Sequence, residues 1–325
     1  SDVCSSDLFL DPRMHWNRLD HLLWRGRTTE ARRMLRLVAY GRRAQAEARI
    51  KLRSLHGGVD KSISTLSEAE KKDLGIIYER IRWRRVKNKN LQTIELFDSI
   101  RRTASHPRLW ATERMIIARR LIALGEASAA WKILRDHQIS PSEDRLSYAK
   151  VQWLAGWLAL RYLRRPTEAF ARFKDLFEVV RYPVSRARAA YWLARSAETL
   201  GDPKLAMQWF IKAAKHPTTF YGQLALQELP NPTQSKIKPA VFDFPPSEKE
   251  SFYGSELVRS VKFLEKIGQH DLARTFFKRL VQNGAGQEIF SKAMHLAKLV
   301  KRVDLAVWLS RRARREGVNF INEGY

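Results

Sequence analysis

The residue types that build metal, nucleotide and nucleophile sites do not form any of the familiar patterns in this chain. The eight histidines are scattered, and neither an H-E-x-x-H pair nor a cysteine cluster occurs. Because a metal site needs several ligands at short spacings, we predict no metal site. A Walker loop, a G-x-G-x-x-G turn and a G-x-S-x-G elbow are also lacking. We therefore predict no cofactor and no serine nucleophile of the elbow type.

Tryptophan is abundant, and aromatic rings commonly stack on sugar rings. The ten tryptophans are Trp16, Trp24, Trp83, Trp110, Trp131, Trp153, Trp157, Trp192, Trp209 and Trp308. Most of them fall on apolar helix faces, as Trp153 and Trp157 do at i, i+4 spacing. This spacing favours packing between helices, with a glycan-binding track as the alternative.

The chain is strongly basic. Lys and Arg number 60 and Asp and Glu number 34, which gives a formal charge of +26. Partners are therefore expected to be anionic, and nucleic acid, anionic lipid and anionic cell-wall polymer all qualify. The basic residues are densest at 25–53 and 80–89. A solvated basic face without a ligand is the alternative.

Cysteine, hydropathy and the first residues limit the compartment. Cys4 is the only cysteine, so no disulfide can form within the chain. No run of 18 apolar residues occurs, which predicts no transmembrane segment. Residues 1–15 lack an apolar signal core. We expect residues 1–8, SDVCSSDL, to be a non-native adapter or cloning segment, and the native amino terminus, with any export signal, to be missing.

A recurring unit predicts helical hairpins. An apolar helix is followed by a short turn with Gly or Pro, and then by a helix with a small residue near its fourth position. Copies occupy residues 22–38, 121–134, 159–173, 198–210, 263–277 and 296–310. The aligned small residues are Ala130, Ala169, Ala206, Ala273 and Ala306. Their spacing is close to the period of about 34 residues of tetratricopeptide hairpins. Such hairpins bury their apolar faces only by stacking, so we predict an all-α superhelix.

Local signals refine this pattern. Residues 57–67 interrupt it and indicate a loop, after which Ser67 to Glu70 suit a helix start. Prolines at 107, 141, 166, 183, 203 and 217 are expected at helix junctions. The Pro-rich stretch 230–246 indicates a linker. Helices are expected to resume near Ser251 and to continue to about Gly317.

The segment from His216 to Leu229, HPTTFYGQLALQEL, is expected to form one further helix. Pro217 suits its first turn, and Thr218 and Thr219 can cap it. Phe220, Tyr221, Leu224, Ala225 and Glu228 share one face at helical spacing. Gly222 costs about 1 kcal/mol relative to Ala inside a helix. Its presence predicts the close approach of another backbone, interpreted as a tight helix–helix contact rather than a ligand site.

The sequence resembles a known enzyme family in this region. PVSRARAAYWLARSAETLGD at 183–202 and AMQWFIKAAKHPTTFYGQLA at 206–225 are similar to the large soluble lytic transglycosylases of Gram-negative bacteria. WLAGWLALRYL at 153–163 resembles the helix one repeat earlier. The match extends more loosely from about Trp16 to the end.

The resemblance implies a domain arrangement. It places an α-superhelical domain at 9–229, a Pro-rich linker at 230–250, a small helical linker domain at 251–320 and the start of a missing lysozyme-like catalytic domain at 321–325. It also implies a periplasmic protein that positions peptidoglycan glycan strands and its own C-terminal catalytic domain. The parent enzyme would cleave the β-1,4 bond between N-acetylmuramic acid and N-acetylglucosamine and leave a 1,6-anhydro product.

The family's catalytic motif is not reproduced. The family has a catalytic Glu in a Glu-Ser pair, followed by Gly-Leu-Met-Gln and later Asn-Ala-Gly segments. Glu250-Ser251 is the only such pair here, and FYGSELV follows it. We therefore assign no catalytic residue in this chain. The rival hypothesis is a basic tetratricopeptide-like scaffold that binds nucleic acid or a protein partner. The match at 183–225 favours the transglycosylase hypothesis over this one. Nucleic acid is therefore not the favoured partner.

Overall fold

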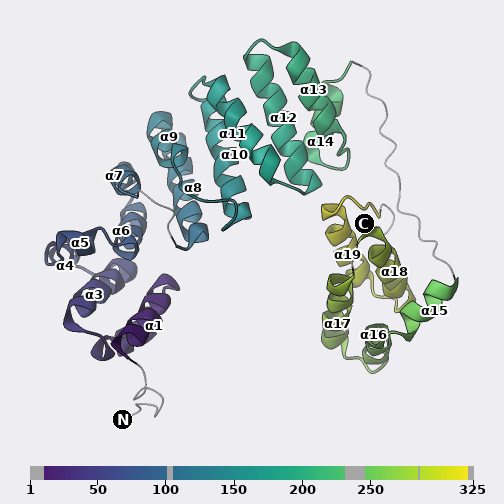
Figure 1. The fold of residues 1–325 in the computed structure, drawn as a ribbon, viewed down its shortest axis with the longest axis horizontal. Coiled ribbons are helices and arrows are strands. Elements are labelled where there is room, and N and C mark those ends of the chain that lie inside the picture. The colour runs from purple at the N-terminus through teal and green to yellow at the C-terminus, as the bar shows by residue number, and fades with distance from the viewer. Residues whose placement is uncertain (1–10, 101–104, 231–245, 285, 321–325) are drawn as a thin grey trace. The chain divides into compact units, whose positions relative to one another are not determined.

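The computed structural model describes residues 11–100, 105–230, 246–284 and 286–320. Over these ranges it contains helices and no strand, which confirms the all-α prediction (Figure 1). The chain divides into two compact units, residues 1–179 and 180–325. The predicted boundary at 230–250 falls largely on 231–245, which lie outside the described residues, as do the predicted adapter 1–8 and residues 321–325.

The helices of the two units have the following bounds. In the first unit they are α1 (Pro12–Trp24), α2 (Thr28–Met34), η2 (Leu35–Leu37), α3 (Tyr40–Ser54), α4 (Val59–Ser64), α5 (Glu68–Lys71), α6 (Leu74–Val86), η3 (Leu91–Thr93), α7 (Ile94–Asp98), α8 (Pro107–Ala123), α9 (Ala127–Arg135), α10 (Arg145–Arg161) and α11 (Pro166–Val179). In the second they are α12 (Pro183–Thr199), α13 (Pro203–Ala214), α14 (Phe220–Gln227), α15 (Pro246–Gly254), α16 (Glu256–Lys266), α17 (His270–Asn283), α18 (Gly286–Leu299) and α19 (Val303–Arg315).

Consecutive helices pair as predicted. The pairs α1–α2, α8–α9, α10–α11, α12–α13, α16–α17 and α18–α19 pack along their lengths, and neighbouring pairs such as α8–α9 and α10–α11 pack on each other. The fourth residue of each second helix is a buried alanine, namely Ala31, Ala130, Ala169, Ala206, Ala273 and Ala306. Because alanine has the smallest side chain that still favours a helix, it lets the second helix approach the first closely. The predicted hairpin array is therefore confirmed within each unit.

A left-handed turn precedes every one of these alanines by five residues. The residue there has a positive φ and is Gly26, Gly125, Arg164, Gly201, Gly268 or Lys301. In most of these turns the next amide donates to a carbonyl five residues back, as from Asp202 to Ala197 at 3.0 Å. This is the Schellman arrangement, which satisfies carbonyls at the end of the first helix. Glycine is favoured in it because it lacks a Cβ.

Three local predictions need correction. Residues 57–67 are not wholly a loop, because α4 occupies Val59–Ser64. The predicted helix start at Ser67 is confirmed: its Oγ accepts from the Glu70 amide at 3.3 Å, and Glu70 accepts from the Ser67 amide at 2.8 Å. α15 begins at Pro246 rather than near Ser251, since proline fits a first helical turn. Pro217 lies in a turn before α14 and not in a helix.

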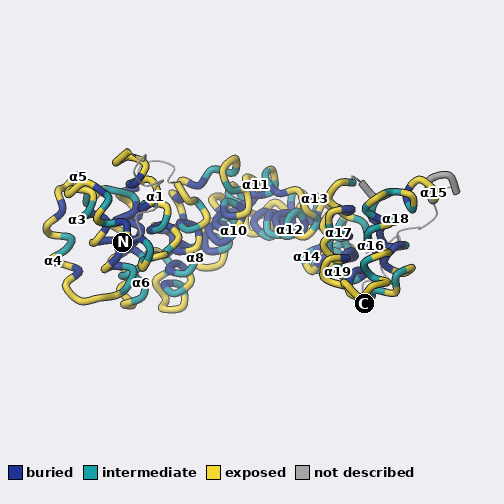
Figure 2. The backbone as a smooth tube through the Cα atoms, turned by 90° about the horizontal axis from the view of Figure 1, so that it is seen from below, coloured by how far each residue is buried: buried dark blue, intermediate teal, exposed yellow. Residues whose placement is uncertain are grey.

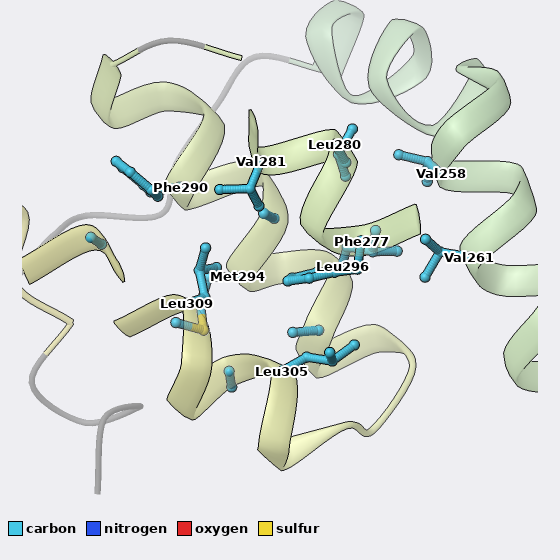
Figure 3. Packing of buried hydrophobic residues seen from close by; sticks show 14 of the residues in the cluster. Val258, Val261, Phe277, Leu280, Val281, Phe290, Met294, Leu296, Leu305 and Leu309 are labelled. Carbon is cyan, nitrogen blue, oxygen red and sulfur yellow. The ribbon is translucent and has the colours of Figure 1, made fainter. Parts of the chain in front are cut away.

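The helices from α15 to α19 share one apolar core (Figure 3). Phe277 and Leu280 of α17, Met294 of α18 and Leu305 and Leu309 of α19 all belong to this core. Buried and exposed positions alternate along the helices with the period expected for one-sided packing (Figure 2). Among the described residues, no helix combines the length and apolar composition needed to cross a membrane.

Candidate functional site

The only Glu-Ser pair is not placed like a catalytic acid. Glu250 is an exposed residue of α15. Ser251 lines a shallow groove with Ser255 and Asn283, whereas Glu250 does not. A general acid in glycan cleavage has to be held against the glycosidic oxygen in an environment that raises its pKa. An exposed helix position does not enclose a carboxyl against a glycosidic oxygen.

Two other glutamates are buried, and both face arginine. Glu79 on α6 is 1% exposed, and its Oε1 accepts from Arg53 Nε at 2.9 Å and Nη2 at 2.5 Å. Glu113 on α8 is bound at both oxygens by Arg85, with 3.0 Å between Nη2 and Oε1. Burial raises the pKa of Glu79, and Arg53 and Arg49 oppose that shift. Such charge-assisted pairs hold helices together, so both carboxylates already have cationic partners.

The predicted packing role of the tryptophans is confirmed for part of the set. Trp24, Trp110, Trp131 and Trp209 are buried. The other six are half-buried, and none of the ten is exposed. Trp153 and Trp157 stack on each other, with ring centroids 6.1 Å apart and planes 17° apart. The half-buried rings are the ones that could still offer an edge or face to a ligand.

Gly222 was correctly predicted to lie close to another backbone segment. The prediction that this segment belongs to another helix was wrong. A Cβ on Gly222 would lie 2.0 Å from the carbonyl oxygen of His216, in the turn immediately before α14. Thr219 caps the helix, because its Oγ1 accepts from the Gly222 amide at 3.1 Å. The close approach is thus local and not a helix–helix contact. It excludes any side chain at position 222.

The face predicted for this helix is also only partly correct. α14 buries Gly222 and Ala225, whereas Phe220 is 68% exposed. Tyr221 packs against Tyr191 of α12, with ring centroids 5.4 Å apart. Arg195 of α12 lies 5.9 Å from the Tyr191 ring centroid and pairs with Glu228 at 3.4 Å. The segment that carries the family resemblance therefore forms one packed three-helix group, α12–α14, with aromatic and charged residues at its edge.

A groove in the first unit combines an aromatic ring with positive charge, and we call it the Trp83 groove. It is lined by Trp83, Arg80, Arg84, Lys71, Lys89 and Asp60, over an apolar floor of Leu52, Val59 and Ile63. Its volume is about 520 Å³, within the range of about 300–1,000 Å³ typical of ligand sites. The lining comes from α3, α4, α5, α6 and the segment around η3. Residues 59–64, which were predicted to be part of a loop, form α4 and supply one side of the groove.

The electrostatics of the Trp83 groove favour an anionic ligand. Lys89 Nζ lies 5.4 Å from the Trp83 ring centroid. Arg84 is held by Glu95 at 2.7 Å, and Lys71 by Glu68 at 2.9 Å. Arg80 forms no ion pair within the described residues. Its pKa is lowered mainly by burial and also by the nearby positive charge of Arg84. A half-buried guanidinium without a carboxylate partner is a donor that an incoming oxyanion can satisfy.

Sequence reasoning did not find the Trp83 groove. Trp83 is one of ten tryptophans and lies in the basic stretch 80–89, but the groove also needs residues of α3, α4 and α5, which no sequence spacing connects to it. The described residues contain no group of His, Cys, Asp or Glu arranged to hold a metal ion. The geometry supports binding of an anionic or sugar-like ligand.

Comparison with known proteins leaves this geometry as the main guide. No protein-family model matches the chain, and no curated protein matches it. Among solved structures, the crystal structure of a Rap protein complexed with competence and sporulation factor aligns with 94% of this chain and 93% of its own. The identity is 11% and the TM-score is 0.32. Similarity at that level supports no inference about fold or function.

Proposed function

We propose that this chain is the non-catalytic helical portion of a periplasmic peptidoglycan lytic transglycosylase. It would position glycan strands and hold a catalytic domain that these residues do not include. By resemblance, that domain cleaves the N-acetylmuramic acid to N-acetylglucosamine β-1,4 bond and leaves a 1,6-anhydro product. The observation that carries the proposal is the residue pattern at 183–202 and 206–225.

The position of that pattern in the fold supports the proposal. Its alanines at 187, 190, 194, 206 and 213 are buried residues of α12 and α13. Its Thr219 and Gly222 form the cap and the close backbone contact that begin α14. These positions tolerate few residue types, because each fills a small space. A shared pattern at such positions is best explained by a shared helical group.

The Trp83 groove provides the contact that a positioning role needs. Its indole ring offers an apolar face to a sugar, and Arg80 and Lys89 offer donors to an acidic substituent. The buried carboxylates Glu79 and Glu113 are engaged by arginines, and Glu250 is exposed. Binding without cleavage is therefore the activity that we propose for these residues.

Co-sedimentation of the purified chain with intact peptidoglycan sacculi tests the proposal. We expect retention to fall as salt rises, because the screening length shrinks from about 8 Å at 0.15 M to about 3 Å at 1 M. Trp83→Leu should lower retention, whereas Trp157→Leu, which changes a half-buried tryptophan on α10 outside this groove, should not. Thermal melting of both variants controls for folding.

A product assay on the same samples tests the absence of cleavage. We expect no anhydromuropeptides from the chain alone. Product that appears with the chain and disappears on Glu250→Gln would overturn the non-catalytic assignment. Retention that stays unchanged at about 1 M salt would show that positive charge is not the basis of binding.

The rival function is a basic scaffold for nucleic acid or a protein partner, and one observation favours it. Exposed arginines gather on α2 and η2 of the first unit. An electrophoretic shift with single- and double-stranded oligonucleotides separates the two functions. A stronger affinity for oligonucleotides than for sacculi at the same salt would favour the scaffold.

A further inference from the structure

A second groove in the first unit is rich in arginine and lies where α1, α2, η2 and α3 meet. Its charged lining is Arg18, Arg32, Arg33, Arg36, Arg43 and Glu47. We propose that this arginine groove binds a phosphate-bearing ligand. The proposal does not rest on the proposed function, because it uses other residues and another ligand chemistry.

The local fold forces these arginines together. Ala31 packs into the core that Leu19 and Leu23 of α1 provide. That contact fixes α2 on α1 and turns Arg32 and Arg33 to the exposed side. The chain then tightens into η2, which carries Arg36, and returns as α3 with Arg43 and Glu47 one helical turn apart. Met34, Leu35 and Leu37 form the apolar floor.

Four of the five arginines that line the groove have no carboxylate partner among the described residues. Arg32, Arg33, Arg36 and Arg43 form no ion pair with any residue that the structure describes, and the same holds for Glu47. The nearby Glu30 is already engaged by Arg27 at 2.6 Å. Neighbouring like charges raise the energy of the empty groove. A bound anion with more than one charge would remove that cost.

Arginine chemistry points to phosphate in particular. All the cations of the groove are arginines, and the guanidinium fork suits the paired oxygens of phosphate better than the point charge of lysine. A single carboxylate is saturated by one guanidinium, whereas a phosphate group presents enough oxygens for several. Arg43 is also oriented in advance, because its Nε donates to the carbonyl oxygen of Leu35 at 3.1 Å. Its two Nη nitrogens remain for a ligand.

Two ligand sources share this chemistry, a soluble phosphate compound and a phospholipid headgroup. Isothermal titration of the full chain with inorganic pyrophosphate tests the site itself. Co-sedimentation with phosphatidylglycerol vesicles, and with phosphatidylcholine vesicles as the neutral comparison, tests the headgroup. Tyr40 is 86% exposed at the start of α3, where an aromatic ring would reach the headgroup layer. Tyr40→Ser should therefore weaken vesicle binding only if lipid is the source.

The decisive variant is Arg32→Gln/Arg33→Gln/Arg36→Gln, which leaves the oriented Arg43 in place. Arg119→Gln/Arg145→Gln/Arg161→Gln removes the same charge from dispersed exposed positions of the same unit and serves as the matched control. We expect saturable pyrophosphate binding that weakens at least about tenfold in the first triple variant, since each lost charge-assisted bond costs about that factor. The control should stay within about twofold, because only screened long-range charge is lost.

Three results would overturn the proposal. One is the absence of saturable pyrophosphate binding by the folded chain. Another is an equal loss in the two triple variants, which would show a diffuse charge effect. The third is displacement of pyrophosphate by acetate at equal concentration, which would show a carboxylate site instead.

Discussion

The α12–α13 pair and the α3–α6–α8 group are built on different kinds of interior. α12 buries alanines, one tyrosine, one leucine and one serine, all of which pack without a formal charge. The α3–α6–α8 group buries Arg49, Glu79, Glu113 and Arg114 among its apolar residues. The buried face of α12 consists mainly of small residues, whereas the α3–α6–α8 interior contains buried charges, of which Glu79 and Glu113 are paired with arginines. The two should therefore respond to different substitutions.

The shape of the charged interior depends on a small residue as well. Arg49 is 1% exposed, and its Nη1 contacts Asp20 of α1 at 2.5 Å. A Cβ on Gly75 at the start of α6 would lie 2.4 Å from the Arg49 guanidinium carbon. Glycine is needed there because a cation, rather than a helix backbone, fills the space. Alanine leaves room for a neighbouring helix, and glycine leaves room for the buried guanidinium.

The largest expected effect comes from breaking a buried charge pair. Glu79→Gln removes the carboxylate that holds Arg53 and leaves a partly buried guanidinium without its counterion. We expect a loss of about 3–5 kcal/mol in the free energy of unfolding, measured by urea denaturation. The matched control is Glu68→Gln, which removes an exposed partner of Lys71 and should leave stability unchanged within error. Equal effects of the two changes would show that burial does not set the value of the pair.

Acid should weaken the first unit through one buried histidine. His137 follows α9 and accepts from the Ile139 amide through Nδ1 at 3.0 Å. Burial, with Arg114 of α8 and Arg172 of α11, lowers its pKa from 6.5 to about 4. Between these values the unfolded chain binds the proton and the folded chain does not, so stability falls as the pH falls from about 6.5 to about 4.

The size of this acid effect is about 3 kcal/mol for His137. Unfolding measured by urea at several pH values should therefore show a smaller slope over this window in His137→Gln. His106 and His216 add a slope of the same sign, because burial lowers their pKa values, whereas the raised pKa of Glu79 adds a slope of the opposite sign. An unchanged slope in the variant would contradict the assignment to His137.

The difference between the two interiors also explains what the sequence could predict. The hairpins were predictable because their signals are local: a turn residue, a cap and an alanine at a fixed offset. The Arg53–Glu79 pair joins residues 26 positions apart, and no periodicity identifies which glutamate meets which arginine. The Trp83 groove needs residues from five parts of the chain, and one of these, α4, was predicted to be a loop. Even a local signal can be incomplete. The glycine at position 222 indicated that another backbone segment lies close, but it did not indicate which segment.

An intermediate effect should come from overfilling the alanine interior. Ala194 of α12 is fully buried, so Ala194→Leu forces three additional carbon atoms into a packed contact. We expect a loss of about 1–3 kcal/mol, measured by thermal or urea unfolding. Ala171→Leu makes the same change at an exposed position of α11 and should cost little. If Ala194→Leu proved neutral, the packing around Ala194 would be looser than its burial indicates.

The smallest expected effect is a gain in stability, and it tests the turn that the hairpins share. Lys301 has a φ of 55° where the equivalent residue in most of the other hairpins is glycine. An L-residue pays about 1–2 kcal/mol for this left-handed conformation, and part of that cost is offset because glycine loses more backbone entropy on folding. Lys301→Gly should therefore raise the free energy of unfolding by up to about 1 kcal/mol.

Lys301→Ala removes the same amine but keeps the Cβ, so it should give no comparable gain. Gly201→Ala, at the same position of the α12–α13 turn, with a φ of 79°, should lose a similar amount. If Lys301→Ala stabilised the chain as much as Lys301→Gly, the strain would lie in the lysine side chain and not in the backbone.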